Sequence, residues 1–367
     1  MGVDFTRLLL FRFRFRSAFL FLLLVVYFIF TFVIFFKAVV PSLDRYTTSE
    51  DFAVDSTVYM YMADSLRSGH PEPWVIGSLA FFPNTTWTPV FISWICNSAF
   101  VVMLVNYTIF VFSTILLTRT FPISWVTLVC LLLLNPTTTT SILCVNKEII
   151  DLLVFSIFLF AHKNRSTRLL LIALTIAILN RYEICIVMLV FLVLSSRANP
   201  LKKKRWLTVL MLVLSLNFVM PIWGAHTLAK RFEEAESAGV IRVLDQLQMH
   251  YLYVIAVFPK ILDNLFGQLP NPQVWQAPSS WLYLNFFNNI AYAILIVTNA
   301  VKRRLSLRND LVYFCVVGSV LIAQSLVVQP RYFYFVYILL CLQAAQPKGY
   351  IPSRIFWPEP SPEVAYA

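Results

Sequence analysis

Two aspartates, Asp51 and Asp55, stand four residues apart in the first polar segment of the chain, which reads DFAVDSTVYMYMADSLRSG. If this segment is helical, the spacing puts both carboxylates on one face, and Tyr59 continues the same stripe. A carboxylate held in this way can take a proton from a hydroxyl group or orient a metal ion. Asp55 could equally be the N-cap of a helix that ends at Gly69, and Asp51 a solvated side chain. The segment therefore predicts a helix with Asp55 as the first candidate for acid–base chemistry and Asp51 as the second.

Cations and further carboxylates interrupt the later apolar runs at three places. Lys147 and Glu148 follow a threonine-rich turn, Arg181 and Glu183 belong to the motif NRYE, and Arg331 follows a proline before the last apolar run. Lysine and arginine in such positions can hold and neutralise a phosphate group. Structural explanations stand beside this one. Glu148 favours the start of a helix, buried Arg181 and Glu183 could pair with each other, and Arg331 could anchor a membrane interface.

Other polar residues predict less chemistry. Asp151 lies three residues after Glu148 inside an apolar run, which is typical of a polar contact between helices. His226 and His250 are too isolated in the sequence to predict a metal site. The six cysteines lie in or beside apolar runs without a CxxC pair, so we interpret them as small hydrophobic residues. Whether a divalent metal such as Mg²⁺ or Mn²⁺ takes part cannot be read from these residues.

The composition indicates an integral membrane protein. Of the 367 residues 59% are hydrophobic and 13% charged, whereas soluble domains carry about 25% charge. Several apolar runs approach or exceed the ~20 residues that cross a bilayer. The net charge of +11 comes from short basic clusters between these runs. We interpret the clusters as a topology signal and not as a nucleic-acid surface.

The elements that must position the candidate residues are about ten transmembrane helices. We expect them near the following ranges: 17–40, 89–118, 121–134, from after Glu148 to 162, two short helices within 169–196 on either side of NRYE, 206–225, 281–300, 310–327 and 333–346. The run 89–118 is longer than one crossing, so its first third is a candidate interfacial helix. We expect residues 1–346 to form one polytopic membrane domain, with an outer loop at 41–88, an outer segment of interfacial helices at 225–280 and a cytoplasmic tail at 347–367. Most of the 29 Lys and Arg residues then lie on the cytoplasmic side with both termini, as the positive-inside rule requires.

The stretch 169–196 has two possible readings. As one straight helix it would put Arg181 and Glu183 at the bilayer centre, which is costly. As two short helices it keeps the basic clusters at both of its ends on one side, and it sends NRYE towards the outer face. Each helix would have about thirteen residues, or ~20 Å, so the turn must lie below the outer surface in a protein-lined vestibule. We therefore expect a short re-entrant-like hairpin, which brings Arg181 to the same face as Asp55, Lys147 and Arg331.

An N-terminal span followed by D-x3-D-x3-Y-x2-MA-x-SL-x2-G resembles the first outer loop of GT-C-type glycosyltransferases. The threonine-rich turn before Lys147 and the PRY turn at Arg331 are similar to features of bacterial members. The resemblance implies a GT-C-like, all-α membrane architecture without a large soluble domain, located in a bacterial inner membrane. It also implies a polyprenyl-phosphate-linked sugar as donor and a glycan or glycolipid as acceptor.

By this resemblance Asp55 is the catalytic base and Asp51 a second carboxylate. Lys147, Arg181 and Arg331 would bind the donor phosphate, with Glu148, Glu183 and Tyr59 in support. Two other functions stay open. One is a polymerase of the O-antigen or capsule kind. Arginine-rich outer loops would favour it, whereas the expected outer loops of this chain are rich in carboxylates and modest in arginine. The other is a lipid-linked sugar flippase, for which we would expect internal repeats and polar sites near the midplane.

Overall fold

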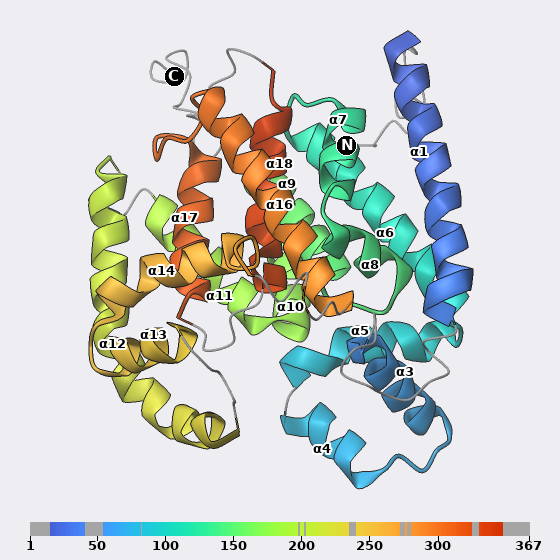
Figure 1. Ribbon diagram of the computed structural model, residues 1–367, viewed down its shortest axis with the longest axis horizontal. Coiled ribbons are helices and arrows are strands. Elements are labelled where there is room, and N and C mark those ends of the chain that lie inside the picture. Colours follow the sequence, from blue (N-terminus) through green and yellow to red (C-terminus); the bar gives the residue numbers. More distant parts are fainter. Residues whose placement is uncertain are drawn as a thin grey trace, which may run out of the picture.

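The computed structural model is built from helices, and no strand occurs in the part of the chain that it describes (Figure 1). The described residues are 15–40, 54–81, 83–196, 199–201, 203–234, 240–271, 276, 280–324 and 330–347. Most of the predicted tail and the first part of the predicted outer loop, with Asp51, lie outside them. An all-helical chain satisfies its backbone hydrogen bonds internally, which a bilayer demands.

Membrane-spanning character is present in a few helices. α6 (Ala99–Thr120) and residues Leu282–Val301 of α16 (Ser280–Val301) are each long and apolar enough to cross a membrane. A third crossing arises if α7 (Trp125–Leu133) and α8 (Pro136–Leu143), bent by 90° to each other, are counted as one span. Other apolar helices have only 10–17 residues in their described parts. The prediction of about ten crossings therefore stays a prediction.

The bend between α7 and α8 has a local cause. The side chain of Asn135 accepts a hydrogen bond from the backbone N–H of Thr137, and Pro136 occupies the first turn of α8. An asparagine cap followed by proline starts a new helix instead of continuing the old one. The threonine-rich segment is therefore a short buried helix, where the sequence predicted a turn.

The predicted hairpin is present as α10 (Thr167–Asn180) and α11 (Tyr182–Ser195), which are separated by Arg181 in an extended conformation. The chain reverses there. Arg181 contacts the start of α9 (Glu148–Lys163), whereas Phe191 on α11 packs against Phe158 and His162 near the other end of α9. Because α11 runs alongside α9 from its start to its end, the chain before α10 and after α11 lies at the same end of the bundle.

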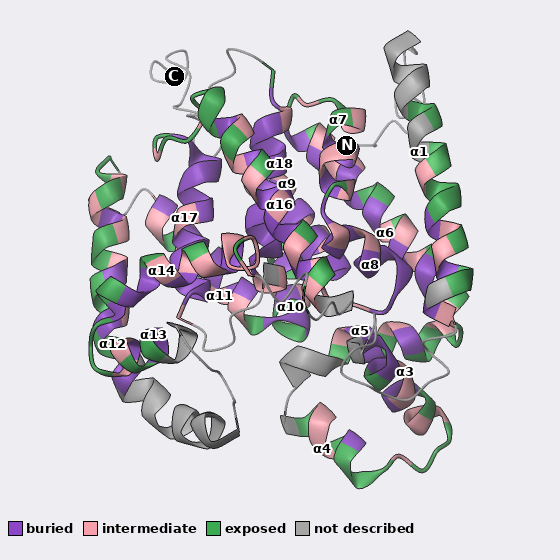
Figure 2. Ribbon diagram, in the orientation of Figure 1, coloured by how far each residue is buried: buried purple, intermediate pink, exposed green. Residues whose placement is uncertain are grey.

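The centre of the molecule consists of α9, α17 (Asp310–Ile322) and α18 (Tyr334–Ala345), which Figure 2 shows to be mostly buried. Their aromatic rings pack together: Phe155 stacks on Phe335 at 5.5 Å between centroids and lies 5.8 Å from Phe314. A short 3-10 helix, η3 (Pro330–Phe333), leads into α18 and contacts α14, α16 and α17.

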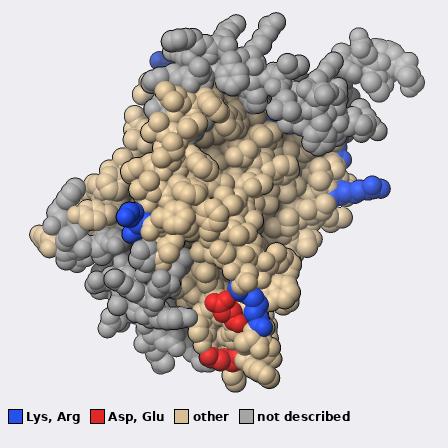
Figure 3. Space-filling view, turned by 90° about the vertical axis from the view of Figure 1, so that its right-hand side faces the viewer, with Lys and Arg blue, Asp and Glu red and all other residues tan. Residues whose placement is uncertain are grey.

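Shorter helices surround this centre. α3 (Val54–Arg67), α4 (Pro73–Phe81) and α5 (Pro83–Cys96) lie together at the lower end in Figure 1. α1 (Phe15–Ile34) continues into a π-helical turn, η2 (Phe35–Val39). α12 (Arg205–Glu234), α13 (Val240–Met249) and α14 (Tyr253–Phe266) complete the opposite side. Figure 3, a view from the α1 side, shows charged side chains mainly towards the edges of a largely uncharged surface.

The run 89–118 divides after its first third, as expected, because Asn97 adopts a positive φ of 49° between α5 and α6. One predicted helix limit was wrong. The expected span 206–225 continues as α12 to Glu234, beyond Pro221, because the amphipathic segment AKRFEE extends the helix.

Basic residues at the end opposite α3–α5 cap helix C-termini. Lys163 donates to the carbonyl oxygen of Thr120, the last residue of α6. Arg304 donates to the carbonyl oxygens of Gln343 and Gln346 at the end of α18. Cations there satisfy the free carbonyl groups and the negative end of the helix dipole. These basic residues thus stabilise helix ends in addition to any role in membrane topology.

Candidate functional site

A buried ionic cluster joins the start of α9 to the α10–α11 turn. It consists of Glu148, Asp151, Asn180 and Arg181, which we call the Arg181 cluster. The guanidinium of Arg181 contacts Glu148 Oε1 through Nη2 at 2.5 Å and Asp151 Oδ2 through Nη1 at 3.0 Å. Asn180 Nδ2 donates to Asp151 Oδ1 at 2.7 Å and to the carbonyl oxygen of Lys147 at 3.1 Å. The extended backbone at Arg181 lets both side chains reach back to α9.

The cluster is buried, and it contains more acidic groups than basic groups. The side chains of Arg181, Glu148 and Asp151 are 7%, 0% and 2% exposed, respectively. Two carboxylates therefore face one guanidinium. Glu148 Oε2 and Asn180 Oδ1 are buried and have no hydrogen-bond partner among the described residues. A buried acceptor is costly unless a donor reaches it, so a proton, a water molecule or a bound group would stabilise this site.

The turn η3 brings the other predicted arginine to the cluster. The guanidinium carbon of Arg181 lies 5.2 Å from the centroid of the Tyr332 ring, and that of Arg331 lies 5.7 Å from the same centroid. Both arginines thus contact one aromatic ring, in the geometry of cation–π interactions. η3 leads directly into α18, and it positions Arg331 close to Arg181 although 150 residues separate them in the sequence.

Helix α3 reaches the same region through its first turn. The hydroxyl of Ser56 accepts a hydrogen bond from the backbone N–H of Val145 at 3.0 Å. The Lys147 ammonium lies 5.6 Å from the centroid of the Tyr59 ring. These contacts place the start of the predicted outer helix beside the residues that precede α9. Asp55 immediately precedes Ser56 in α3, and its side chain lies outside the described residues.

Hydrogen bonds from α8 to α16 and α18 hold the segment that leads into the cluster. The hydroxyls of Thr138 and Tyr334 lie 2.9 Å apart, and the backbone N–H of Thr137 donates to Asn288 Oδ1 on α16 at 3.2 Å. Both contacts are buried. They hold the threonine-rich helix against α16 and α18, which fixes the short connection from α8 to Lys147.

The structure brings together five of the predicted site residues: Tyr59, Lys147, Glu148, Arg181 and Arg331. Glu183 follows the turn, is half-buried and makes no ion pair with a described residue. The partners of Arg181 are instead Glu148 and Asp151, so the predicted Arg181–Glu183 pair does not form.

The polar contact between helices that was predicted for Asp151 is present, because Asp151 on α9 binds Asn180 and Arg181. Asn180 and Tyr332 were not among the predicted site residues. The sequence signal for Asp151 was its position one helical turn after Glu148, which puts both carboxylates on one face of α9.

The other candidates lie apart from this site. His250 is exposed, and the side chain of His226 lies outside the described residues. Among the described residues, no group of three or more His, Cys, Asp or Glu side chains could hold a metal ion.

Comparisons with known proteins give no relative: no family model, curated protein or solved structure matches this chain. The chemistry must therefore be argued from the site itself. It combines a buried acid pair, partly exposed Lys147 and Arg331, and a nearby helix that carries Asp55. Such a site can hold an anionic group and move a proton.

Proposed function

We propose that this protein is a membrane glycosyltransferase. It moves a sugar from a polyprenyl-phosphate donor to a lipid-linked glycan or another acceptor. The observation that carries the proposal is the convergence of α3, the start of α9, the α10–α11 turn and η3 on the Arg181 cluster. Four segments far apart in the sequence contribute cations and carboxylates to one end of a membrane-embedded bundle, as a phosphate-linked donor and a proton-losing acceptor require.

In this proposal Asp55 takes the proton of the acceptor hydroxyl. The acceptor oxygen then bonds to the anomeric carbon of the sugar from the side opposite the phosphate. The bond between that carbon and the phosphate oxygen breaks, its electrons leave with polyprenyl phosphate, and the configuration is inverted. Lys147 and Arg331, which are half-buried, stabilise the charge of the departing phosphate.

The charge of Arg181 is largely compensated by carboxylates. Its two terminal nitrogens already bind Glu148 and Asp151, so much of its charge is compensated within the cluster. It can contribute to phosphate binding only through the N–H groups that do not face Glu148 and Asp151, beside the Tyr332 ring that Arg331 also contacts. Asp51, Glu183 and a divalent metal enter the proposal only as further candidates.

The architecture that we propose for this function is GT-C-like, with about ten membrane crossings in a bacterial inner membrane. Both termini and the basic helix ends face the cytoplasm, and the Arg181 cluster faces outward. The α10–α11 hairpin supports this arrangement, because it returns the chain to the basic end without crossing.

The decisive experiment compares two substitutions on α3. Purified protein is supplied with polyprenyl-phosphate sugars and glycolipid acceptors, and transfer is measured for wild type, Asp55→Asn and Asp64→Asn. Asp64 lies on the same helix, is 61% exposed and pairs with Arg67. We expect Asp55→Asn to lose at least about a hundredfold in rate, as is typical for a general base, and Asp64→Asn to stay active. Undiminished transfer by Asp55→Asn would exclude this catalytic role, and extension of lipid-linked repeats would indicate a polymerase instead.

A further inference from the structure

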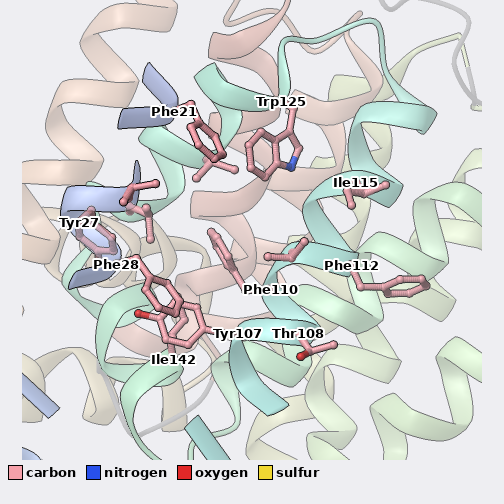
Figure 4. A pocket seen from close by; sticks show the side chains of 14 residues that line it. Phe21, Tyr27, Phe28, Tyr107, Thr108, Phe110, Phe112, Ile115, Trp125 and Ile142 are labelled. Carbon is pink, nitrogen blue, oxygen red and sulfur yellow. The ribbon is translucent and has the colours of Figure 1, made fainter. Parts of the chain in front are cut away.

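A large apolar cavity lies between α1, α6, α7 and α8, apart from the Arg181 cluster (Figure 4). Its volume is about 580 Å³, within the usual range of ligand pockets. Fourteen residues line it, including Phe21 and Val25 of α1, Ile115 of α6 and Val129 of α7. Half of the lining residues are aromatic. α1 also exposes apolar side chains on its other faces, such as Val26 and Phe30, so it faces the hydrocarbon of the membrane.

The polar atoms around the cavity are already bonded within the protein. The hydroxyl of Tyr27 bonds to Thr139, and that of Tyr107 bonds to Thr31. The Trp125 indole donates to Thr114 at 3.0 Å, and the hydroxyl of Thr108 donates to the carbonyl oxygen of Leu104 at 2.9 Å. A polar occupant would therefore find few unsatisfied partners, and the interior suits a hydrocarbon.

The cavity wall on α6 ends in a cation. Tyr107, Val111 and Ile115 line the cavity at intervals of four residues, and Arg119 is the next residue of the same stripe. Arg119 is exposed and lies one helical turn, ~6 Å, beyond Ile115. Trp125, which starts α7, lines the same end of the cavity (Figure 4). Along the cavity, apolar side chains are followed by the indole of Trp125 and then by the Arg119 cation, which is the order of side chains found at a bilayer interface.

The length of the cavity argues against a protein segment as occupant. The lining residues of α1 run from Phe21 to Phe28, a rise of ~10 Å. A transmembrane helix needs apolar contact over the ~30 Å of the hydrocarbon core, about three times that length. A flexible hydrocarbon chain can fill a space this short.

We propose that this cavity binds an acyl chain of an anionic phospholipid whose phosphate lies against Arg119. The lipid belongs to the leaflet at the basic end of the bundle, where anionic lipids meet Lys and Arg side chains. This site is separate from the donor site of the proposed function and does not depend on it. The lipid would fill the space between α1 and the bundle.

The test uses the full-length protein in phosphatidylcholine nanodiscs that contain photoreactive phosphatidylglycerol, with the reactive group on the acyl chain. Cross-linked peptides are mapped by mass spectrometry. Val25→Trp fills the cavity, whereas Val26→Trp puts the same side chain on an exposed neighbour that does not line it. Arg119→Gln removes the cation, and Arg168→Gln removes another exposed one at the same end.

We expect cross-links on α1, α6 and α7 that Val25→Trp abolishes and Val26→Trp preserves. Arg119→Gln should reduce phosphatidylglycerol labelling about fivefold, to the level of photoreactive phosphatidylcholine, and Arg168→Gln should leave it unchanged. Equal labelling in the two tryptophan variants would overturn the site. Equal labelling by the two lipids in wild type would overturn its preference for an anionic headgroup. Displacement of the label by polyprenyl phosphate, but not by unlabelled phosphatidylglycerol, would assign the cavity to the donor instead.

Discussion

At the scale of residues, the two carboxylates of the Arg181 cluster differ in their hydrogen-bond partners. Asp151 accepts from Asn180 at Oδ1 and from Arg181 at Oδ2, so both of its oxygens are occupied. Glu148 accepts from Arg181 at Oε1, and its Oε2 has no partner among the described residues. Asp151 therefore holds the turn in place, whereas Glu148 has an oxygen that can receive a donor.

Removal of the guanidinium should be costly for stability. Arg181→Met leaves Glu148 and Asp151 buried without their cation, and breaking a buried ion pair from one side costs about 3–5 kcal/mol. Thermal unfolding in detergent measures the loss, with Arg168→Met, an exposed arginine, as the control. If both variants unfold at the same temperature, the cluster does not hold the hairpin to α9.

The two carboxylates should respond differently to amide substitution. In Glu148→Gln the new N–H₂ group can take the place of Oε2, which has no donor facing it, so Oε1 still accepts from Arg181. In Asp151→Asn an N–H₂ group must face a donor from either Asn180 or Arg181. We expect Asp151→Asn to lose about 1–3 kcal/mol more stability than Glu148→Gln. Unfolding of both variants in the same detergent checks this order, and a larger loss in Glu148→Gln would contradict it.

At the scale of elements, α17 packs closely on α18 because Gly318 has no side chain. A Cβ atom at Gly318 would clash with the Phe335 ring and lie 3.1 Å from Val187 Cγ1 on α11. Phe335 is itself stacked on Phe155 and cannot move away freely. Gly318→Ala should therefore destabilise the protein by about 1–3 kcal/mol through overpacking. Gly77→Ala in α4 is the control, because nothing lies within 4 Å of its Cβ position. Equal unfolding temperatures would mean that α17 can shift to admit the methyl group.

A second buried ion pair links α13 to α14. Lys260 Nζ lies 2.5 Å from Asp245 Oδ1, and Gln248 links Lys260 to the carbonyl oxygen of Gln324 after α17. Burial raises the pKa of Asp245 and lowers that of Lys260, although each charge favours the other. Desolvation thus outweighs pairing for both groups.

Lys260→Met should destabilise the protein by about 3–5 kcal/mol, since it leaves Asp245 buried alone. Adding Asp245→Leu should recover most of that loss, because two apolar side chains need no partner. A double variant as unstable as Lys260→Met would show that the pair itself stabilises the α13–α14 hairpin. Chemical unfolding of the two variants in detergent makes the comparison.

At the scale of the whole molecule, composition and charge pattern predicted the helical class and most helix positions. The break at Arg181 was predictable because a charged turn inside 28 apolar residues is costly in a straight helix. The partners of Arg181 were not, because they depend on α9 packing against the hairpin. The α7–α8 bend was not predicted, because it depends on the cap that the Asn135 side chain provides. The extension of α12 to Glu234 was not predicted either, because the helix continues through Pro221.

The distribution of charge between the two ends makes a prediction about orientation. The Arg181 cluster and α3–α5 lie at one end, and the basic residues that cap α6 and α18 lie at the other. Ser68 is exposed after α3, and Lys203 is exposed before α12. A membrane-impermeant thiol reagent should label Ser68→Cys in intact cells, and Lys203→Cys only after permeabilisation, because the positive-inside rule holds basic segments in the cytoplasm. Unsubstituted protein supplies the background from the six native cysteines, of which Cys144, Cys185, Cys315 and Cys341 are buried. Labelling of both positions in intact cells would mean that the chain crosses the membrane between them an even number of times. Either the hairpin would then be a full span, or one of the other expected spans in this stretch would not cross, and the proposed orientation would be wrong.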